Sequence, residues 1–69
     1  MRTEIFNKVK GMNIENAKKV LVENGYCEYF MRVVECEDCT LLKVKDNATT
    51  ITTLTAFDNG IEKKNTYKI

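Results

Sequence analysis

The chain contains no histidine, no proline and no tryptophan, and serine does not occur in it either. Without histidine it lacks the usual general base of neutral pH, and without serine it lacks the nucleophile of hydrolase elbows. Its three glycines are too scattered to form a phosphate-binding loop. We therefore expect a protein that binds a partner and is not an enzyme, and we expect no cofactor.

A long apolar run and a strong excess of one charge are also missing. No stretch approaches the roughly 20 apolar residues that span a bilayer, and the first residues lead into no signal peptide. We therefore expect a cytoplasmic protein without membrane contact. The net charge is +1, from 11 basic and 10 acidic residues, and the lysines are interleaved with acids. This balance makes nucleic acid an unexpected partner.

Length and composition describe one small domain. The chain has 69 residues, of which 43% are hydrophobic and 30% are charged, and these values are ordinary for globular proteins. A domain of this size buries only roughly 60% of the surface that its unfolded chain exposes, so its own core is marginal. We expect residues 1–69 to form a single domain that associates with itself as a homodimer or higher oligomer.

The clearest periodic pattern is helical and covers residues 14–24. Asn13 can cap the first turn through its side chain, and Gly25 suits the left-handed position after the last turn. The apolar residues at helical spacing are Ile14, Ala17 and Leu21. This pattern predicts an amphipathic helix with one face toward a core.

The segment before this helix fits two structures. Ile5, Phe6 and Val9 have the spacing of a short helix that ends at Gly11. The same residues also fit an extended arm. The pattern alone leaves open whether residues 3–10 are helical.

From Tyr26 onward the chain is rich in β-branched and aromatic residues, which favour strands. Three polar breaks divide this part, at Glu37-Asp38, at Asp46-Asn47 and at residues 58–60. The breaks predict four strands joined as an antiparallel meander. The expected fold is therefore α+β, with one main helix packed on a four-stranded antiparallel sheet.

The turn lengths predict strand registers and a core face. The expected cross-strand pairs are Met31 with Val44, Val33 with Leu42, Leu42 with Ile51, Phe57 with Ile61, and Ile51 with Tyr67. The residues expected on the core face are Cys27, Tyr29, Met31, Val33, Leu42, Val44, Ile51, Phe57, Ile61, Tyr67 and Ile69. The helix would cover this face and complete a two-layer domain.

The opposite face of the predicted sheet is unusually apolar for a surface, and this suggests an interface. The candidate interface or ligand residues are Tyr26, Phe30, Arg32, Val34, Leu41 and Leu54. Val34 and Leu41 should be cross-strand neighbours. Arg32 can grip a phosphate or carboxylate, and Tyr26 and Phe30 can stack on a ring. The expected partners are another copy of the chain, an anionic small molecule such as a nucleotide, or a host protein.

The segment Cys36-Glu37-Asp38-Cys39 has the spacing of one half of a zinc site. Only Cys27 remains as a third thiol and no histidine exists, so a single chain cannot complete a tetrahedral site. Two chains could share a site of four thiolates. The adjacent acids disfavour thiolates and oppose a redox role, so we interpret the cysteines as ordinary thiols in a reducing compartment and expect no metal.

Two resemblances bear on function. The order of the helix, the strand at Arg32-Val33-Val34 and the turn at Asp58-Asn59-Gly60-Ile61 resembles potato inhibitor I type peptidase inhibitors. That likeness implies an exposed protease-binding loop. The chain lacks the proline and supporting arginines of such a loop, and residues 37–48 fit a hairpin better.

The chain is rich in Lys, Asn, Ile and Thr, a composition that is typical of low-GC coding sequences. In this composition, in size and in the lack of enzymatic residues, it also resembles small phage proteins that counter bacterial immunity. This resemblance implies a homo-oligomer that sequesters a nucleotide-type immune signal or blocks a host protein. The alternative is a regulatory DNA-binding module that uses the N-terminal helices. Its phosphate contacts would come from Lys8, Lys10, Lys18 and Lys19.

Overall fold

The computed structural model describes residues 1–69 and contains two α-helices followed by four strands. The elements are α1 (Thr3–Val9), α2 (Ile14–Glu23), a short 3-10 helix (Glu28–Phe30), β1 (Met31–Glu35), β2 (Thr40–Asn47), β3 (Thr50–Phe57) and β4 (Gly60–Lys68). The strands form one antiparallel sheet in the order β1-β2-β3-β4. The α+β class and the meander are therefore confirmed, with two helices where one main helix was predicted.

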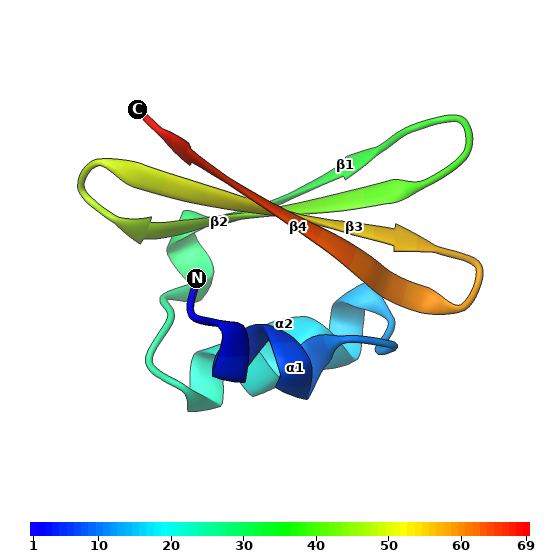
Figure 1. Ribbon diagram of the computed structural model, residues 1–69, viewed down its shortest axis with the longest axis horizontal. Coiled ribbons are helices and arrows are strands. Elements are labelled where there is room, and N and C mark those ends of the chain that lie inside the picture. Colours follow the sequence, from blue (N-terminus) through cyan, green and yellow to red (C-terminus); the bar gives the residue numbers. More distant parts are fainter.

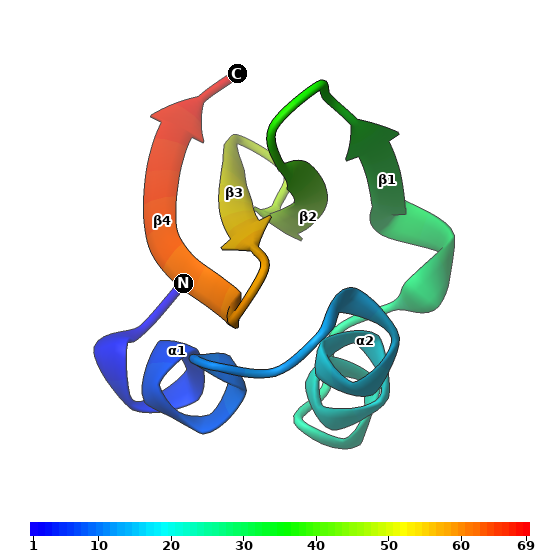
Figure 2. The same cartoon turned by 90° about the vertical axis from the view of Figure 1, so that its right-hand side faces the viewer.

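The domain has two layers, with both helices on one face of a strongly twisted sheet (Figure 1). Seen along the sheet, α1 lies on the side of β4 and α2 lies on the side of β1 (Figure 2). No helix or loop covers the opposite face. Neither helix is long and apolar enough to cross a membrane.

Local signals define α2 as the sequence predicts. The Asn13 side chain accepts a hydrogen bond of 2.8 Å from the backbone N–H of Asn16, so it caps the helix. Ala17 and Leu21 are completely buried against the sheet. The helix ends where Gly25 adopts a φ of 96°, a conformation that glycine reaches without steric cost.

The open question about residues 3–10 is resolved in favour of a helix. Ile5 and Val9 are one helical turn apart and both are buried in the core. Gly11, with a φ of 85°, then reverses the chain toward α2. Because α1 supplies two core residues, it is a full member of the helical layer.

The first hairpin has the predicted register. Met31 pairs with Val44 and Val33 pairs with Leu42. The turn lies at Glu37-Asp38, and the backbone N–H of Cys36 donates to the carbonyl of Cys39 over 2.9 Å. The two-residue turn therefore sets this register as expected.

The β2–β3 register differs from the prediction. Asn47 pairs with Thr50, so the turn residues are Ala48 and Thr49 and not Asp46-Asn47. The side-chain oxygen Oδ1 of Asn47 accepts hydrogen bonds from the Thr49 N–H (2.9 Å) and hydroxyl (3.1 Å), which holds this turn. Asp46 has no ladder partner and forms a bulge.

This change of register moves β3 by an odd number of residues, which exchanges its two faces. Leu42 pairs with Leu54 and not with Ile51. Leu54 is therefore completely buried in the core, whereas the prediction placed it on the surface. Ile51 faces away from the helices and is only half-buried.

The last hairpin combines a shorter turn with a compensating bulge. Phe57 pairs with Gly60, so the predicted pair of Phe57 with Ile61 is wrong. An extra residue at Glu62 then shifts β4 by one position, and the predicted pair of Ile51 with Tyr67 is correct. That pair lies on the face away from the helices.

The core is thus drawn from both helices and the three C-terminal strands. Its apolar members are Ile5, Val9, Ala17, Leu21, Leu42, Val44, Leu54, Ala56 and Ile61, with Met31 packed against them. The predicted core residues that are exposed are Cys27, Tyr29, Val33, Phe57, Tyr67 and Ile69. Cys27, Tyr29 and Ile69 lie outside the strands, where the alternation of faces does not apply, whereas Phe57 and Tyr67 face outward because of the changed register of β3.

Candidate ligand-binding face

We call the side of the sheet that faces away from the helices the outer face. Partners in an antiparallel ladder point to the same side, so the registers define its cross-strand rows. The rows contain Lys45, Ile51 and Tyr67, then Arg32, Lys43, Thr53 and Asn65, then Val34, Leu41, Thr55 and Lys63. The outer face is therefore a mixture of basic, hydroxyl, amide and apolar side chains.

The charges in the cross-strand rows of the outer face have one sign. Its ionisable side chains are Arg32, Lys43, Lys45 and Lys63, and no acid occupies any of the rows. The structure contains two ion pairs, Met1 with Asp46 and Lys18 with Glu28, and neither involves these four cations. The paired rows of a chain with a net charge of +1 thus hold four cations and no acid, and the acid next to them in β4 is Glu62, in the bulge beside Lys63.

Two exposed aromatic rings stand at one end of the outer face, on the 3-10 helix before β1. Tyr29 is 86% exposed and Phe30 is 50% exposed. The rings meet edge to face, with centroids 5.2 Å apart and planes at 88°. The ammonium of Lys45 lies 5.3 Å from the centre of the Phe30 ring. Aromatic and cationic groups are therefore adjacent at this end.

A third exposed ring marks the other end. Phe57 follows Thr55 on the same side of β3, and its ring centre lies 5.8 Å from the ammonium of Lys63. The outer face is therefore bounded at both ends by an aromatic ring with a lysine beside it.

An open hollow of about 430 Å³ lies on the outer face beside the first aromatic pair. Its lining residues are Tyr29, Phe30, Met31, Arg32, Lys43, Lys45 and Ile51. Three cations and two aromatic rings thus converge on one depression, without an opposing acid.

The structure brings together four of the six candidate residues predicted from the sequence. Arg32, Val34 and Leu41 lie on the outer face, with Val34 opposite Leu41 as expected, and Phe30 lies at its end. Leu54 is wrong as a surface residue because the β3 register buries it. Tyr26 is also wrong, because it precedes the first strand and packs half-buried against the core.

Sequence reasoning missed the lysines of this face. Lys43 and Lys45 alternate with Leu42 and Val44, a pattern that places both lysines on the outer side once those apolar residues are in the core. Lys63 could not be found in this way, because the bulge at Glu62 breaks the alternation of β4.

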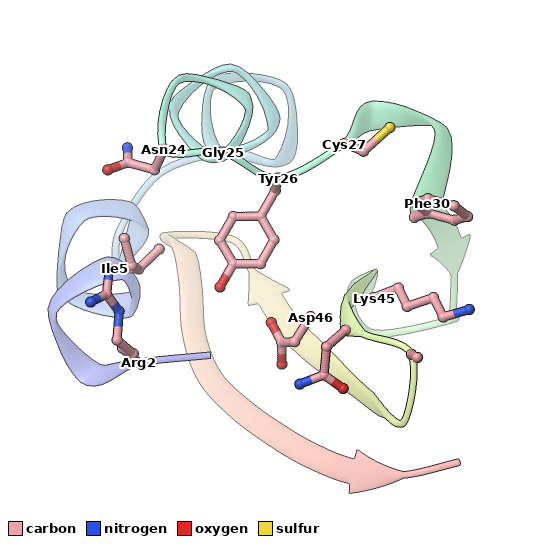
Figure 3. Close-up of a pocket in the computed structure, with 11 residues that line it drawn as sticks. Arg2, Ile5, Asn24, Gly25, Tyr26, Cys27, Phe30, Lys45 and Asp46 are labelled. Carbon is pink, nitrogen blue, oxygen red and sulfur yellow. The ribbon is translucent and has the colours of Figure 1, made fainter.

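A second hollow, of about 520 Å³, opens between the helices and the sheet at the other side of Phe30 (Figure 3). Tyr26 projects into it, with Asp46 and Arg2 among the lining residues. The Asp46 carboxylate already pairs with the buried ammonium of Met1 at 2.8 Å and accepts a bond from the Thr52 hydroxyl. Because the charges here are mixed and partly paired, this hollow is a poorer anion site.

The environment of Tyr26 predicts a measurable pH effect. Burial, and then the negative charge of Asp46, raises the pKa of Tyr26 above the ordinary value of 10.0. The neutral phenol is thus favoured in the folded state, so its contribution to stability is complete below the unfolded pKa and is lost as the pH rises through the folded pKa. As the pH rises from about 9 to 12, the free energy of unfolding measured in urea should fall less for Tyr26→Phe than for the natural protein. Equal losses would contradict this assignment.

The helical side carries charges of both signs. Its α2 surface hollow is lined by Glu15, Lys18, Lys19, Val22, Glu23 and Glu28. The Lys18 ammonium lies 3.7 Å from Glu28, and the Lys8 ammonium donates to the Asn24 side chain over 3.1 Å. This interleaving offers phosphates no continuous basic surface, so the outer face is the better candidate.

The three thiols do not form a metal centre within one chain. Cys36 and Cys39 flank the first turn, Cys27 is exposed before the 3-10 helix, and no cluster of three metal-ligating side chains occurs. Partial burial, the neighbouring Cys36 and the charge of Asp38 raise the pKa of Cys39. The thiol form is therefore favoured at Cys39, which opposes a role as a reactive thiolate.

Comparison with known proteins finds no matching family model, no matching curated protein and no matching solved structure.

Proposed function

We propose that this protein is a non-enzymatic binding protein whose outer face holds an anionic ligand of nucleotide type. The observation that carries the proposal is the grouping of Arg32, Lys43 and Lys45 beside the exposed rings of Tyr29 and Phe30, with no acid among the residues that line this hollow. A nucleotide combines the two features that such a surface complements, namely negative phosphates and a flat base.

Electrostatics favours an outer face with a bound anion over one that is empty or that is paired with a second copy. The four outer cations have no ion-pair partner, so their mutual repulsion is relieved only by solvent and counterions. The planar guanidinium of Arg32 can bind two phosphate oxygens at once, and the lysines act as point charges. A bound phosphate would therefore replace repulsion with charge-assisted hydrogen bonds.

The mechanism we propose is occupancy without chemical conversion. If the chain acts during phage infection, as its general character suggests, the bound molecule would be a nucleotide immune signal withheld from its receptor. Blocking of a host protein is the other form of occupancy, and it requires an acidic surface on that protein to match the outer face.

Self-association, if it uses the outer face, should depend on the ligand. An isologous contact would place each cation of one copy near cations of the other, which is unfavourable without an intervening anion. The burial of Leu54 also removes one of the apolar side chains that were expected to seal such a contact. We therefore propose that any dimer through this face contains anionic ligand between the copies.

Calorimetric titration with ATP and with a cyclic dinucleotide tests the proposed function. Lys43→Glu should weaken binding about 10- to 100-fold, because each charged hydrogen bond contributes about 1.5–3 kcal/mol. The matched control is Lys19→Glu, which makes the same charge change on the exposed surface of α2. Light scattering on the same samples reports whether ligand changes the mass, and mass spectrometry reports whether the nucleotide is intact.

Three outcomes would contradict the proposal. Nucleotide turnover would show an enzyme, and equal loss of binding in the Lys43 and Lys19 variants would show that the site is not on the outer face. Absence of binding to nucleotides and oligonucleotides alike would remove the nucleotide function altogether.

A further inference from the structure

We propose that the natural occupant of the outer face is a single-stranded nucleic acid, laid across the sheet from the Tyr29–Phe30 pair toward Phe57. This inference rests on the proposed function and names the ligand class more narrowly. It follows from the spacing of the cations, from the aromatic rings at both ends and from an unsatisfied hydroxyl between them.

The four cations together extend farther than one nucleotide, because Lys63 lies outside the hollow that Arg32, Lys43 and Lys45 line. Lys45 and Lys63 are two strands apart and two rows apart, which corresponds to about 16 Å between their backbones in a regular sheet. The phosphates of a mononucleotide are joined to one another and form a single compact charge. A strand carries one phosphate for each nucleotide, so it can reach Lys45, Lys43 and Lys63 in turn.

The aromatic rings favour unpaired bases. Phe30 directly precedes β1 and Phe57 ends β3, so the two rings lie at opposite ends of the outer face, and Tyr29 is almost fully exposed beside Phe30. Bases stack on such rings in proteins that bind single strands without strong sequence preference. In a duplex the base faces are already stacked, so paired bases could not use these platforms.

The middle of the outer face contains a polar atom without a partner. Thr53 is only 5% exposed, lies between Lys43 and Asn65 in its row, and its hydroxyl oxygen makes no hydrogen bond in the protein. A buried hydroxyl without a partner is unfavourable and calls for an explanation. Because the oxygen itself has almost no exposed surface, a sugar or base oxygen would satisfy it only if the neighbouring side chains of the row moved aside, and these are Lys43 and Asn65.

This inference differs from the expectation that was based on net charge. The net charge of +1 adds the basic outer face to the acids of the helices and turns. A ligand on the sheet meets the local charge and not the sum over the chain. A surface with four cations is sufficient for a strand of a few nucleotides.

Fluorescence anisotropy with labelled oligothymidylates of different length tests the inference on the full chain. Affinity should rise with length from thymidine monophosphate until the strand reaches from the Tyr29–Phe30 pair to Phe57, and should then level off. A plot of the logarithm of the binding constant against the logarithm of the salt concentration should have a slope of about −2.8, because four phosphates are neutralised.

Variants assign the contacts. Tyr29→Ala should weaken binding about 5- to 100-fold through loss of stacking, and its near-complete exposure makes it neutral for folding. Lys43→Glu should reduce the salt slope by about 0.7 or more, whereas Lys19→Glu should leave it unchanged. Thr53→Val, which keeps the shape of the side chain, should weaken binding without lowering the unfolding midpoint.

The outcomes separate this inference from the proposed function. If thymidine monophosphate or a cyclic dinucleotide binds as tightly as the longer strands, the single-strand inference is wrong and the nucleotide function remains. Equal affinity for a duplex, or for polyglutamate of matched charge, would also overturn it. If no nucleotide and no strand binds, both proposals fail together.

Discussion

Gly60→Ala is expected to have the largest destabilising effect, a loss of about 2–6 kcal/mol in the free energy of unfolding. Gly60 is buried with a φ of 99°, and a β-carbon there would lie 2.5 Å from the carbonyl carbon of Gly11 and 2.8 Å from the carbonyl oxygen of Met12. These are backbone atoms held in place, because the Gly11 N–H donates to the Ile61 carbonyl (2.8 Å) and the Ile61 N–H donates to the Met12 carbonyl (2.9 Å). The methyl group would therefore separate β4 from the loop between the helices.

The expected cost is the sum of two effects. The left-handed backbone costs an alanine about 1–3 kcal/mol, and overpacking adds about 1–3 kcal/mol. A domain of this length has a total stability of about 3–10 kcal/mol, so the combined loss can consume most of it. Circular dichroism at increasing urea concentration measures the change.

Gly25→Ala is the matched control for this prediction. Gly25 has a φ of 96°, nearly that of Gly60, but a β-carbon there would meet no atom within 4 Å. The control should lose only the backbone contribution and remain folded. If the two variants were equally stable, the close packing of Gly60 against the helical loop would be wrong.

Leu54→Ala has the second large expected effect. Leu54 is completely buried opposite Leu42, and removal of its side chain should cost about 2–5 kcal/mol through lost burial and the cavity that remains. Leu41→Ala is the natural comparison, because Leu41 is a half-buried leucine on the outer face. It should cost about 1 kcal/mol, since it buries less area and leaves no enclosed cavity.

The same pair of variants tests the strand register. With the turn at Asp46-Asn47, Leu54 would be on the surface and Ile51 in the core, so Leu54→Ala would be nearly neutral. Urea unfolding with an unchanged slope would give the stability difference directly. A smaller loss for Leu54 than for Leu41 would contradict the register on which the outer face depends.

The parts of the fold that depend on local chemistry could be predicted from the sequence. The Asn13 cap, the spacing of Ala17 and Leu21, and the glycine after the last turn defined α2. The first hairpin was also predictable, because Glu37-Asp38 lies between two strand-like runs and a turn there pairs apolar residues of one run with apolar residues of the other. In these regions a few neighbouring residues are enough to determine the local structure.

The candidate site was only partly predictable. Arg32 and Phe30 were recognised from their types and their place before or within the first strand. Tyr26 was misplaced because it precedes β1 and the strand alternation does not apply to it. The lysines of β2 and β4 were overlooked because a charge count over the whole chain conceals how the charges divide between two faces.

By itself, then, the sequence determined an α+β domain with a capped helix and an antiparallel meander, because caps, turns and periodicity act over a few residues. Only the tertiary structure decided which side of β3 is inside. Around Asp46, Asn47 and Ala48 more than one turn is locally acceptable, and the choice falls to the register that buries Leu54 and Ala56 beneath the helices. That single choice, together with the bulge at Glu62, also brings the basic and aromatic residues of distant segments onto one uncovered face.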